Sequence, residues 1–219
     1  MIEIISTQDG SHTLRLAALN ETYHSIHGAV QESKHVFIRH GFEAKVLQGN
    51  HDLHILEVGF GTGLNALLTV HASRQHHVKV YYHSLEAYPL DEAIWSQLNY
   101  PGETERNVFH QLHRVEWNHW NSITENFEFF KDTNKLEDAL LQATTYDLVY
   151  FDAFAPEKQP EMWTIAVFQK IYDAMKPGAT LVTYCAKGQV KRDLKSIGFT
   201  VEALPGPPGK REMIRAIRS

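Results

Sequence analysis

The chain has 219 residues, of which 43% are hydrophobic and 11% aromatic, and this composition predicts a folded domain and excludes a largely disordered chain. Its single cysteine, Cys185, excludes an internal disulfide and is compatible with a reducing compartment. The N-terminus lacks the basic start and apolar run of a signal peptide, and no stretch approaches the ~18 apolar residues of a membrane span. We therefore expect a cytoplasmic protein without membrane contact.

Charge is distributed unevenly along the chain. The formal net charge of −5 does not by itself indicate a nucleic-acid partner. Residues 176–219, however, contain nine Lys or Arg and three acidic residues. Residues 1–175 contain twelve Lys or Arg and twenty-three acidic residues. A basic end on an acidic protein is compatible with a phosphate-binding surface, and equally with ordinary solvated charge.

The hydrophobic pattern alternates between strand-like and helix-like segments from residue 53 onward. Expected strands lie at 53–58, 78–86, 127–130, 146–154, 179–186, 199–204 and 212–217. Expected helices lie at 64–73, 91–98, 160–175 and 190–196, with a turn at Pro177-Gly178. Residues 1–50 do not fit this alternation, and we predict that they form an N-terminal extension or lid ahead of a main domain at 51–219.

This alternation predicts an α/β fold with a mostly parallel, seven-stranded sheet covered by helices on both faces. The last two strands, joined by the tight LPGPPGK loop, suit an antiparallel hairpin at the sheet edge. Sheets of this kind bind ligands beyond the C-terminal ends of their strands, at the point where the strand order reverses.

The first expected strand runs into three glycines, Gly59, Gly61 and Gly63, and then into a helix. Glycine permits a sharp turn and a close approach of a ligand to the backbone. The dinucleotide fingerprint expects Gly or Ala at its sixth position, which is Leu64 here. Glu57 would repel a pyrophosphate, but it would attract the ammonium group of a methionine moiety. The motif therefore favours S-adenosylmethionine over NAD, with Glu57 and the three glycines as cofactor-binding residues.

Three further acidic residues follow expected strands. Glu86 lies 27 residues after Gly59 and can accept hydrogen bonds from both ribose hydroxyls, which supports a nucleoside without separating NAD from S-adenosylmethionine. Asp132 follows the FEFF segment and can accept a bond from an adenine amino group. Asp152 ends a strongly apolar strand and should face the same crevice as the glycine loop. Because an unpaired buried carboxylate is costly, we predict that Asp152 acts near the ligand.

Other chemistry-bearing patterns are weak. The fourteen histidines include pairs at 24/27 and 110/113, but no Cys or carboxylate cluster completes a metal site, so no metal is expected. Cys185 ends an apolar strand and is interpreted as a buried hydrophobic residue. The sequence contains no G-x-S-x-G nucleophile motif.

Three segments, LEVGFGTGLNALLT, FDAFAPEKQPEMWT and PGPPGKREMIRA, together resemble a bacterial family of methyltransferases. That family completes 5-methylaminomethyl-uridine, or its 2-thio form, at the tRNA wobble position, and the resemblance runs from about Tyr23 to the C-terminus. It implies a Rossmann-like class I methyltransferase fold, S-adenosyl-L-methionine as cofactor and the tRNA anticodon region as partner. In many bacteria this unit is joined to a flavin-dependent oxidase half. Because the chain ends at Ser219 without a second glycine fingerprint, no flavin is expected here.

The resemblance assigns residues of this sequence to family positions. The cofactor-binding positions match Glu57, Gly59, Gly61, Gly63, Glu86 and Asp132, and the catalytic position matches Asp152. The loop, helix-start and terminal motifs match Phe154, Pro156, Met162, Trp163, Lys210, Arg211, Glu212 and Met213, and the lid segment matches Tyr23 and Glu32-Ser33.

In the predicted mechanism, Asp152 orients the primary amine of 5-aminomethyl-uridine and accepts its proton. The modified base must leave the anticodon stack, and Phe154 and Trp163 are predicted to stack on it. The residues expected to contact backbone phosphates are Lys187, Lys191, Arg192, Lys210 and Arg211.

Three other functions remain compatible with the sequence. One is a methyltransferase for a small-molecule or protein amine, which the acidic net charge favours. The second is a nicotinamide-dependent oxidoreductase, which Leu64 and Glu57 disfavour. The third is a binding module without catalysis, which the four intact acidic residues disfavour.

Overall fold

The computed structural model describes residues 2–102 and 105–219. Its strands are β1 (Ile2–Ser6), β2 (His12–Leu16), β3 (Glu21–Thr22), β4 (Asp52–Val58), β5 (Lys79–Leu85), β6 (Trp120–Thr124), β7 (Phe127–Asp132), β8 (Tyr146–Phe151), β9 (Met175–Thr183), β10 (Phe199–Pro205) and β11 (Glu212–Arg218). Its helices are α1 (Ala29–Ser33), η1 (Lys34–Phe42), α2 (Glu43–Val46), α3 (Leu64–His76), α4 (Glu92–Trp95), α5 (Arg106–Arg114), η3 (Pro160–Trp163), α6 (Ile165–Ala174) and α7 (Gly188–Ile197). In the described part of the chain, no helix is both long and apolar enough to cross a bilayer.

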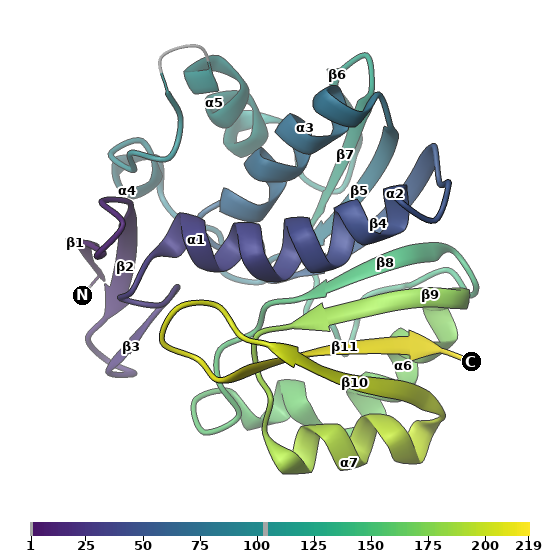
Figure 1. Ribbon diagram of the computed structural model, residues 1–219. Helices are drawn as coiled ribbons and strands as arrows, with labels where there is room; N and C mark the ends of the chain where they lie inside the picture. Colours follow the sequence, from purple (N-terminus) through teal and green to yellow (C-terminus); the bar gives the residue numbers. More distant parts are fainter. Residues whose placement is uncertain (1, 103–104) are drawn as a thin grey trace.

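The main sheet contains eight strands within the described ranges, in the order β10-β11-β9-β8-β4-β5-β7-β6 (Figure 1). The central pairs β4–β5, β4–β8, β5–β7 and β8–β9 are parallel. The edge pairs β6–β7, β9–β11 and β10–β11 are antiparallel. The chain leaves β4 for β5 on one side and later returns to β8 on the other, so the strand order reverses at β4. This confirms the α/β fold, the mostly parallel sheet and the C-terminal hairpin.

The structure differs from the predicted elements in several places, and strands β1 to β3 and helices α1, η1, α2 and α5 were not predicted. The eighth strand is β6, an antiparallel edge strand that the pattern did not indicate. Pro177 and Gly178 lie inside β9 as an exposed irregularity, because the β8–β9 register shifts between Tyr146 and Leu148. The expected helix at 160–175 is two elements, η3 and α6. The break falls at Thr164, whose side chain accepts a hydrogen bond from Val167 N and begins α6.

Side chains of the central strands alternate between two apolar layers. In β4, Leu53 and Ile55 point into the layer that includes residues of α3 and α5, whereas Leu56 and Val58 point into the layer of α6 and α7. Glu57 follows the alternation and lies on the same face as Leu53 and Ile55. A carboxyl group therefore enters the layer beneath α3, just before the glycine loop begins.

Residues of the N-terminal segment contribute to this first layer. The segments α1, η1 and α2 form one continuous helix over residues 29–46, which contacts α3, β8 and β9 (Figure 1). Its Phe37 and Phe42 are almost fully buried in the core. Strands β1, β2 and β3 form a separate small antiparallel sheet. A domain boundary at residue 50 stays a prediction.

Candidate active site

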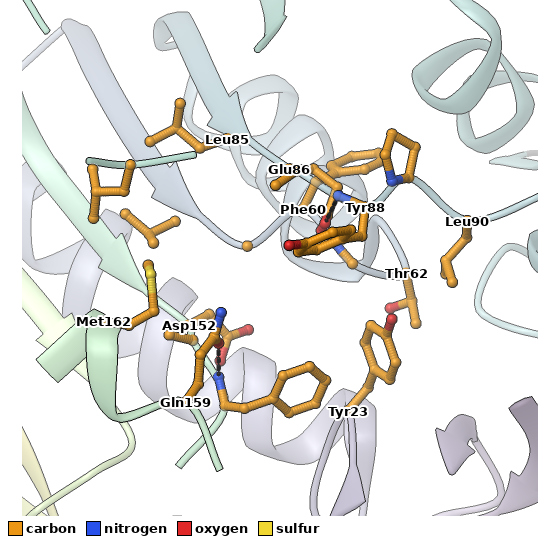
Figure 2. Close-up of a pocket in the computed structure, with 18 of the residues that line it drawn as sticks. Tyr23, Phe60, Thr62, Leu85, Glu86, Tyr88, Leu90, Asp152, Gln159 and Met162 are labelled. Atoms are coloured by element: carbon orange, nitrogen blue, oxygen red, sulfur yellow. Dashed lines mark hydrogen bonds between the residues drawn. The ribbon is translucent and has the colours of Figure 1, made fainter. Parts of the chain in front are cut away.

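A cavity of about 560 Å³ opens beyond the C-terminal ends of β4, β5 and β8, where the strand order reverses. Its wall brings together seven of the residues that the resemblance assigned, namely Tyr23, Gly59, Gly61, Glu86, Asp152, Phe154 and Met162. Figure 2 shows Glu86, Asp152 and Tyr23 arranged around this space. The volume lies within the range of ~300–1,000 Å³ typical of small-molecule sites.

The glycine loop is held against neighbouring strands by backbone contacts. Gly59 has φ +96° and donates its N–H to Leu85 O at 3.0 Å. A Cβ at Gly59 would lie 2.9 Å from the carbonyl oxygen of Asp152, and one at Gly61 would lie 3.1 Å from the ring of Tyr23. Gly63 is the N-cap of α3, and a Cβ there would lie 2.8 Å from Nε2 of His113. The loop backbone can follow this path only with glycine at these positions.

We expect Gly59→Ala to weaken S-adenosylmethionine binding at least tenfold and to lower the free energy of unfolding by about 1–3 kcal/mol. The substitution combines an unfavourable φ with a collision against the Asp152 carbonyl. Gly49→Ala is the matched control, because Gly49 has φ +87° but open space where a Cβ would lie. Calorimetry and urea denaturation of both variants check this prediction. Equal losses of cofactor binding and of unfolding free energy in the two variants would show that the collision with the Asp152 carbonyl contributes nothing to either.

Glu86 follows β5 and holds the glycine loop through its carboxylate. Its Oε2 accepts a hydrogen bond from Gly61 N at 2.8 Å, and its Oε1 accepts one from Tyr88 N at 2.9 Å. Burial raises the pKa of Glu86, and these two bonds partly oppose that rise. Each carboxylate oxygen keeps a further lone pair, so Glu86 can still accept bonds from a ribose diol in the cavity.

Asp152 follows β8 and lies in the cavity wall next to the glycine loop. Its Oδ2 accepts a hydrogen bond from Asn65 Nδ2 at 2.8 Å. Burial raises the pKa of Asp152 to about 7, the charge of Glu32 adds to this rise, and Asn65 and Lys210 oppose it. A carboxyl group with a pKa near neutrality can accept and release a proton at physiological pH, as a general base requires.

Glu57 lies beneath the glycine loop and is fully buried. Its Oε2 accepts a hydrogen bond from Ser84 Oγ at 2.6 Å. Burial raises the pKa of Glu57 to about 8, and the charge of Asp152 contributes further. Glu57 is not among the residues that line the cavity, so a direct contact between Glu57 and the cofactor stays a prediction.

Asp132 ends β7, and its carboxylate is hydrogen-bonded to neighbouring residues. Its Oδ1 accepts hydrogen bonds from Asn134 N and Nδ2 at 2.8 and 2.7 Å, and its Oδ2 lies 3.3 Å from His83 Nε2. It is Asn134, not Asp132, that lies in the cavity wall. Asp132 therefore fixes the loop that carries Asn134, and its contact with adenine stays a prediction.

The two aromatic residues predicted to contact substrate lie in different environments. Phe154 faces the cavity and meets the ring of Tyr23 edge-to-face at 5.1 Å between centroids. Trp163 is only 7% exposed, packs against Phe151 and Phe168, and donates its Nε1–H to Phe154 O at 2.7 Å. The prediction that Trp163 stacks on substrate is thus corrected, because its ring belongs to the core and it supports Phe154 from behind. Pro156 lies in the same loop, outside the cavity wall.

The C-terminal basic residues lie over a shallow depression beside the main cavity. Lys210 Nζ donates to the buried carboxylate of Glu32 at 2.6 Å and lies 3.7 Å from the ring centroid of Tyr184. Lys210 thus forms an internal ion pair between the terminal loop and α1, and its contact with a phosphate stays a prediction. Arg211 is exposed and lines the depression. Two other predicted contacts form ion pairs, Lys187 with Glu157 and Lys191 with Glu212.

Sequence reasoning missed three residues of the site. Asn65 lies in the first turn of α3, directly after the glycine motif, and this position was the signal that could have identified it. Tyr184 follows β9 and donates its hydroxyl to Ala153 O at 2.9 Å. Gln159 accepts a hydrogen bond from Phe154 N at 3.2 Å and lies beside Asp152 in Figure 2. Within residues 2–102 and 105–219, no group of three or more His, Cys, Asp or Glu side chains is placed to hold a metal ion.

A cavity lined by glycines and by the carboxyl groups of Glu86 and Asp152, at the switch point of a mostly parallel sheet, is typical of nucleotide-binding α/β proteins. Residues 110–219 match a family model described as S-adenosyl-L-methionine-dependent methyltransferase. The chain belongs to this family of S-adenosyl-L-methionine-dependent methyltransferases.

Two curated relatives carry the name tRNA 5-methylaminomethyl-2-thiouridine biosynthesis bifunctional protein MnmC. The protein from Nitrosospira multiformis is 32% identical, with 89% of this chain and 34% of that protein covered. The protein from Magnetococcus marinus is 33% identical, with 89% and 31% covered. The chain therefore spans about a third of the length of these relatives. The matches confirm the family resemblance predicted from the sequence motifs.

Solved structures agree with this assignment. The crystal structure of MNMC2 from Aquifex aeolicus has a TM-score of 0.84 at 26% identity, and the match covers 100% of this chain and 70% of that one. Spermidine synthase from Thermotoga maritima has a TM-score of 0.60 at 14% identity, with 100% and 69% covered, and shows a shared fold.

Proposed function

We propose that this chain methylates the aminomethyl nitrogen of 5-aminomethyl-(2-thio)uridine at the tRNA wobble position, in the cytoplasm, giving 5-methylaminomethyl-(2-thio)uridine. The curated relatives are named for the biosynthesis of this nucleoside. The observation that carries the proposal is the carboxyl group of Asp152, which lies in the cavity wall and has a pKa of about 7. That position and pKa suit a group that receives a proton from an amine.

The residues present fit S-adenosyl-L-methionine. The glycines keep the loop free of side chains where the cofactor would approach, and a Cβ at Gly59 or Gly61 would collide with its surroundings. Glu86 would bind the ribose, and Leu136 and Asn134 line the part of the cavity that would take the adenine. When bound, the cofactor supplies a methyl group on a positively charged sulfonium.

The acceptor amine must be neutral, because a protonated amine has no lone pair with which to attack. Asp152 as a carboxylate would accept a hydrogen bond from this amine and direct its lone pair toward the methyl group. Transfer would form a bond between the nitrogen and the methyl carbon and would break the bond from that carbon to the sulfur of the donor. The new ammonium group releases one proton, which Asp152 can accept.

The opposite side of the cavity would receive the base. Phe154 and Tyr23 present aromatic rings there, and Leu16 and Leu19 add apolar surface from the N-terminal segment. Lys158 Nζ donates to Leu19 O at 2.8 Å and so joins the loop after β8 to this segment. We include in the proposal that the part of residues 1–50 that lines the cavity at residues 16–24 acts as a lid over the base, whereas the helix over residues 29–46 belongs to the core. The base must leave the anticodon stack to reach Asp152.

Mass spectrometry of tRNA nucleosides tests this proposal. tRNA that carries 5-aminomethyl-uridine or its 2-thio form is incubated with the protein and methyl-labelled S-adenosylmethionine. We expect the label in the 5-methylaminomethyl nucleoside, and no label when the tRNA carries unmodified wobble uridine. Label in free polyamines or amino acids, with none in tRNA, would contradict the proposal.

One observation favours the alternative of a small-molecule amine substrate. Lys187, Lys191 and Lys210 are each paired with a carboxylate, so much of the basic C-terminal surface is already neutralised. Arg211 distinguishes the two functions because it is exposed. If tRNA is the substrate, Arg211→Ala should weaken tRNA binding and reduce the salt-dependence slope by ~1. An unchanged slope would favour the small-molecule substrate.

A further inference from the structure

Gln159 presents its side-chain amide to the cavity in the loop after β8. Its backbone is fixed there, because its N–H donates to Ala155 O at 3.0 Å and its carbonyl accepts a bond from Met162 N at 3.1 Å. Its side-chain Oε1 accepts a hydrogen bond from Phe154 N at 3.2 Å. Figure 2 shows Gln159 and Asp152 on the same side of the cavity, and both residues belong to its wall.

The bond from Phe154 determines which end of this amide is available to a ligand. An amide accepts at its oxygen and donates from its nitrogen, and the hydrogen-bond network decides which end lies where. Exchange of the two ends of Gln159 would place its NH₂ group against the N–H of Phe154, donor against donor. Nε2 therefore keeps the other position. Within residues 2–102 and 105–219 it has no hydrogen-bond partner, so both of its N–H groups are available to a ligand.

Two other donors of this wall are used by the protein itself. Lys158 Nζ donates to Leu19 O at 2.8 Å, and Tyr184 donates its single O–H to Ala153 O at 2.9 Å. Gln159 Nε2 differs from both, because it offers two N–H groups on the side of the cavity that holds the Asp152 carboxylate. The wall thus combines an acceptor for an amine with a neutral donor.

This combination matches the edge of a 5-substituted uracil. The acceptor amine is joined through a methylene group to C5, and the carbonyl oxygen O4 is on the neighbouring carbon C4, so both groups leave the same edge of the base. A protein that binds the amine through Asp152 therefore needs a donor next to that carboxylate to bind O4. Cytosine has an amino group in place of O4, and that group donates where uracil accepts.

We infer that Gln159 Nε2 donates a hydrogen bond to O4 of the base, and that Gln159 thereby selects uracil over cytosine as the ring that carries the aminomethyl group. Gln159 is then a specificity-determining residue, and its Oε1 at the same time holds the backbone of Phe154. The inference rests on the proposed function, because it takes the aminomethyl nitrogen to lie at Asp152. Position 2 is across the ring from C5, so Gln159 does not distinguish the 2-thio form from the 2-oxo form.

Binding of two synthetic anticodon stem-loops, in the presence of S-adenosylhomocysteine, tests the inference. One carries 5-aminomethyl-uridine at the wobble position and the other 5-aminomethyl-cytidine, and calorimetry gives the dissociation constant of each. We expect the wild-type protein to bind the uridine form about tenfold more tightly, because the cytosine amino group would meet the Gln159 NH₂ group donor to donor.

Gln159→Glu should lower this preference about tenfold, since glutamate keeps an acceptor for Phe154 N but presents a second acceptor, not a donor, to the base. Gln142→Glu, at an exposed position outside the cavity wall, is the matched control and should keep the wild-type preference. Comparing the two stem-loops within each variant removes any general effect of the new charge near Asp152.

The same uridine preference in Gln159→Glu and the wild type, or no preference in the wild type, would overturn the inference. If Gln159→Glu does not fold, Gln159→Met decides the question, because it removes the amide without adding a charge and should also reduce the preference. Methyl transfer to the same stem-loops is measured separately. Selective binding of the uridine form without transfer would contradict the proposed function and still support the contact of Gln159 with the base. A wild-type protein that binds neither stem-loop would overturn both.

Discussion

Asp152→Asn is expected to lower the rate of methyl transfer by about 100- to 10,000-fold, the usual contribution of a positioned general base. Asparagine keeps the shape of the side chain and can still accept the hydrogen bond from Asn65, so the fold and the cofactor half of the cavity should be preserved. Its uncharged amide cannot accept a proton from the amine. Single-turnover transfer of a labelled methyl group measures the rate, and calorimetry with S-adenosylmethionine should give a dissociation constant close to that of the wild type.

The pH dependence gives the same substitution a second readout. Because the pKa of Asp152 is raised to about 7 and the active form is the carboxylate, the wild-type rate should rise as the pH increases through 7. Protonation of the acceptor amine acts in the same direction. In Asp152→Asn the component from Asp152 should vanish. Asp193→Asn, at a partly exposed position on α7 outside the cavity wall, is the matched control and should keep the wild-type rate and profile. Near-normal turnover in Asp152→Asn would refute the role of Asp152.

The parts of the fold that the sequence predicted are those where burial dictates residue type. Strands β4 and β8 lie at the centre of the sheet, so their apolar runs indicated strands directly. Strand β6 escaped prediction because it is an edge strand whose Trp120 is 47% exposed and which lacks an apolar alternation. The helix over residues 29–46 was obscured for a different reason. Its polar residues include Glu32 and Lys45, which are buried in ion pairs and hydrogen bonds with distant parts of the chain.

The sequence correctly placed in the cavity those residues that directly follow strands of the parallel sheet. Gly59, Glu86 and Asp152 follow parallel neighbouring strands, so their meeting in one cavity follows from the topology. Side-chain direction beyond the strand ends did not follow. Trp163 turns into the core because η3 places it against Phe151. Lys210 turns inward because Glu32, 178 residues earlier in the chain, offers a buried carboxylate. Such pairings depend on tertiary contacts that no local pattern contains.

Glu57→Gln is expected to make the protein more stable at pH 8 than the wild type. The unfolded chain loses the Glu57 proton near pH 4.5, whereas the folded protein keeps it to about pH 8. Between these values the unfolded state is favoured increasingly as the pH rises, so stability is lost from pH 4.5 upward and the loss levels off near pH 8. A shift of this size corresponds to about 5 kcal/mol, and glutamine, which does not ionise, removes the cost.

Urea denaturation at pH 5, 6.5 and 8 measures this effect. The wild-type free energy of unfolding should fall across this range, and that of Glu57→Gln should fall by a few kcal/mol less. Glutamine can also accept the hydrogen bond from Ser84 through its Oε1, so the substitution should cost little at pH 5. The exposed Glu137→Gln serves as control and should follow the wild type at every pH. Parallel pH dependence in Glu57→Gln and the wild type would mean that Glu57 ionises as easily in the folded protein as in the unfolded chain. The carboxyl group beneath the glycine loop would then be solvated or paired, and its burial would have no energetic consequence.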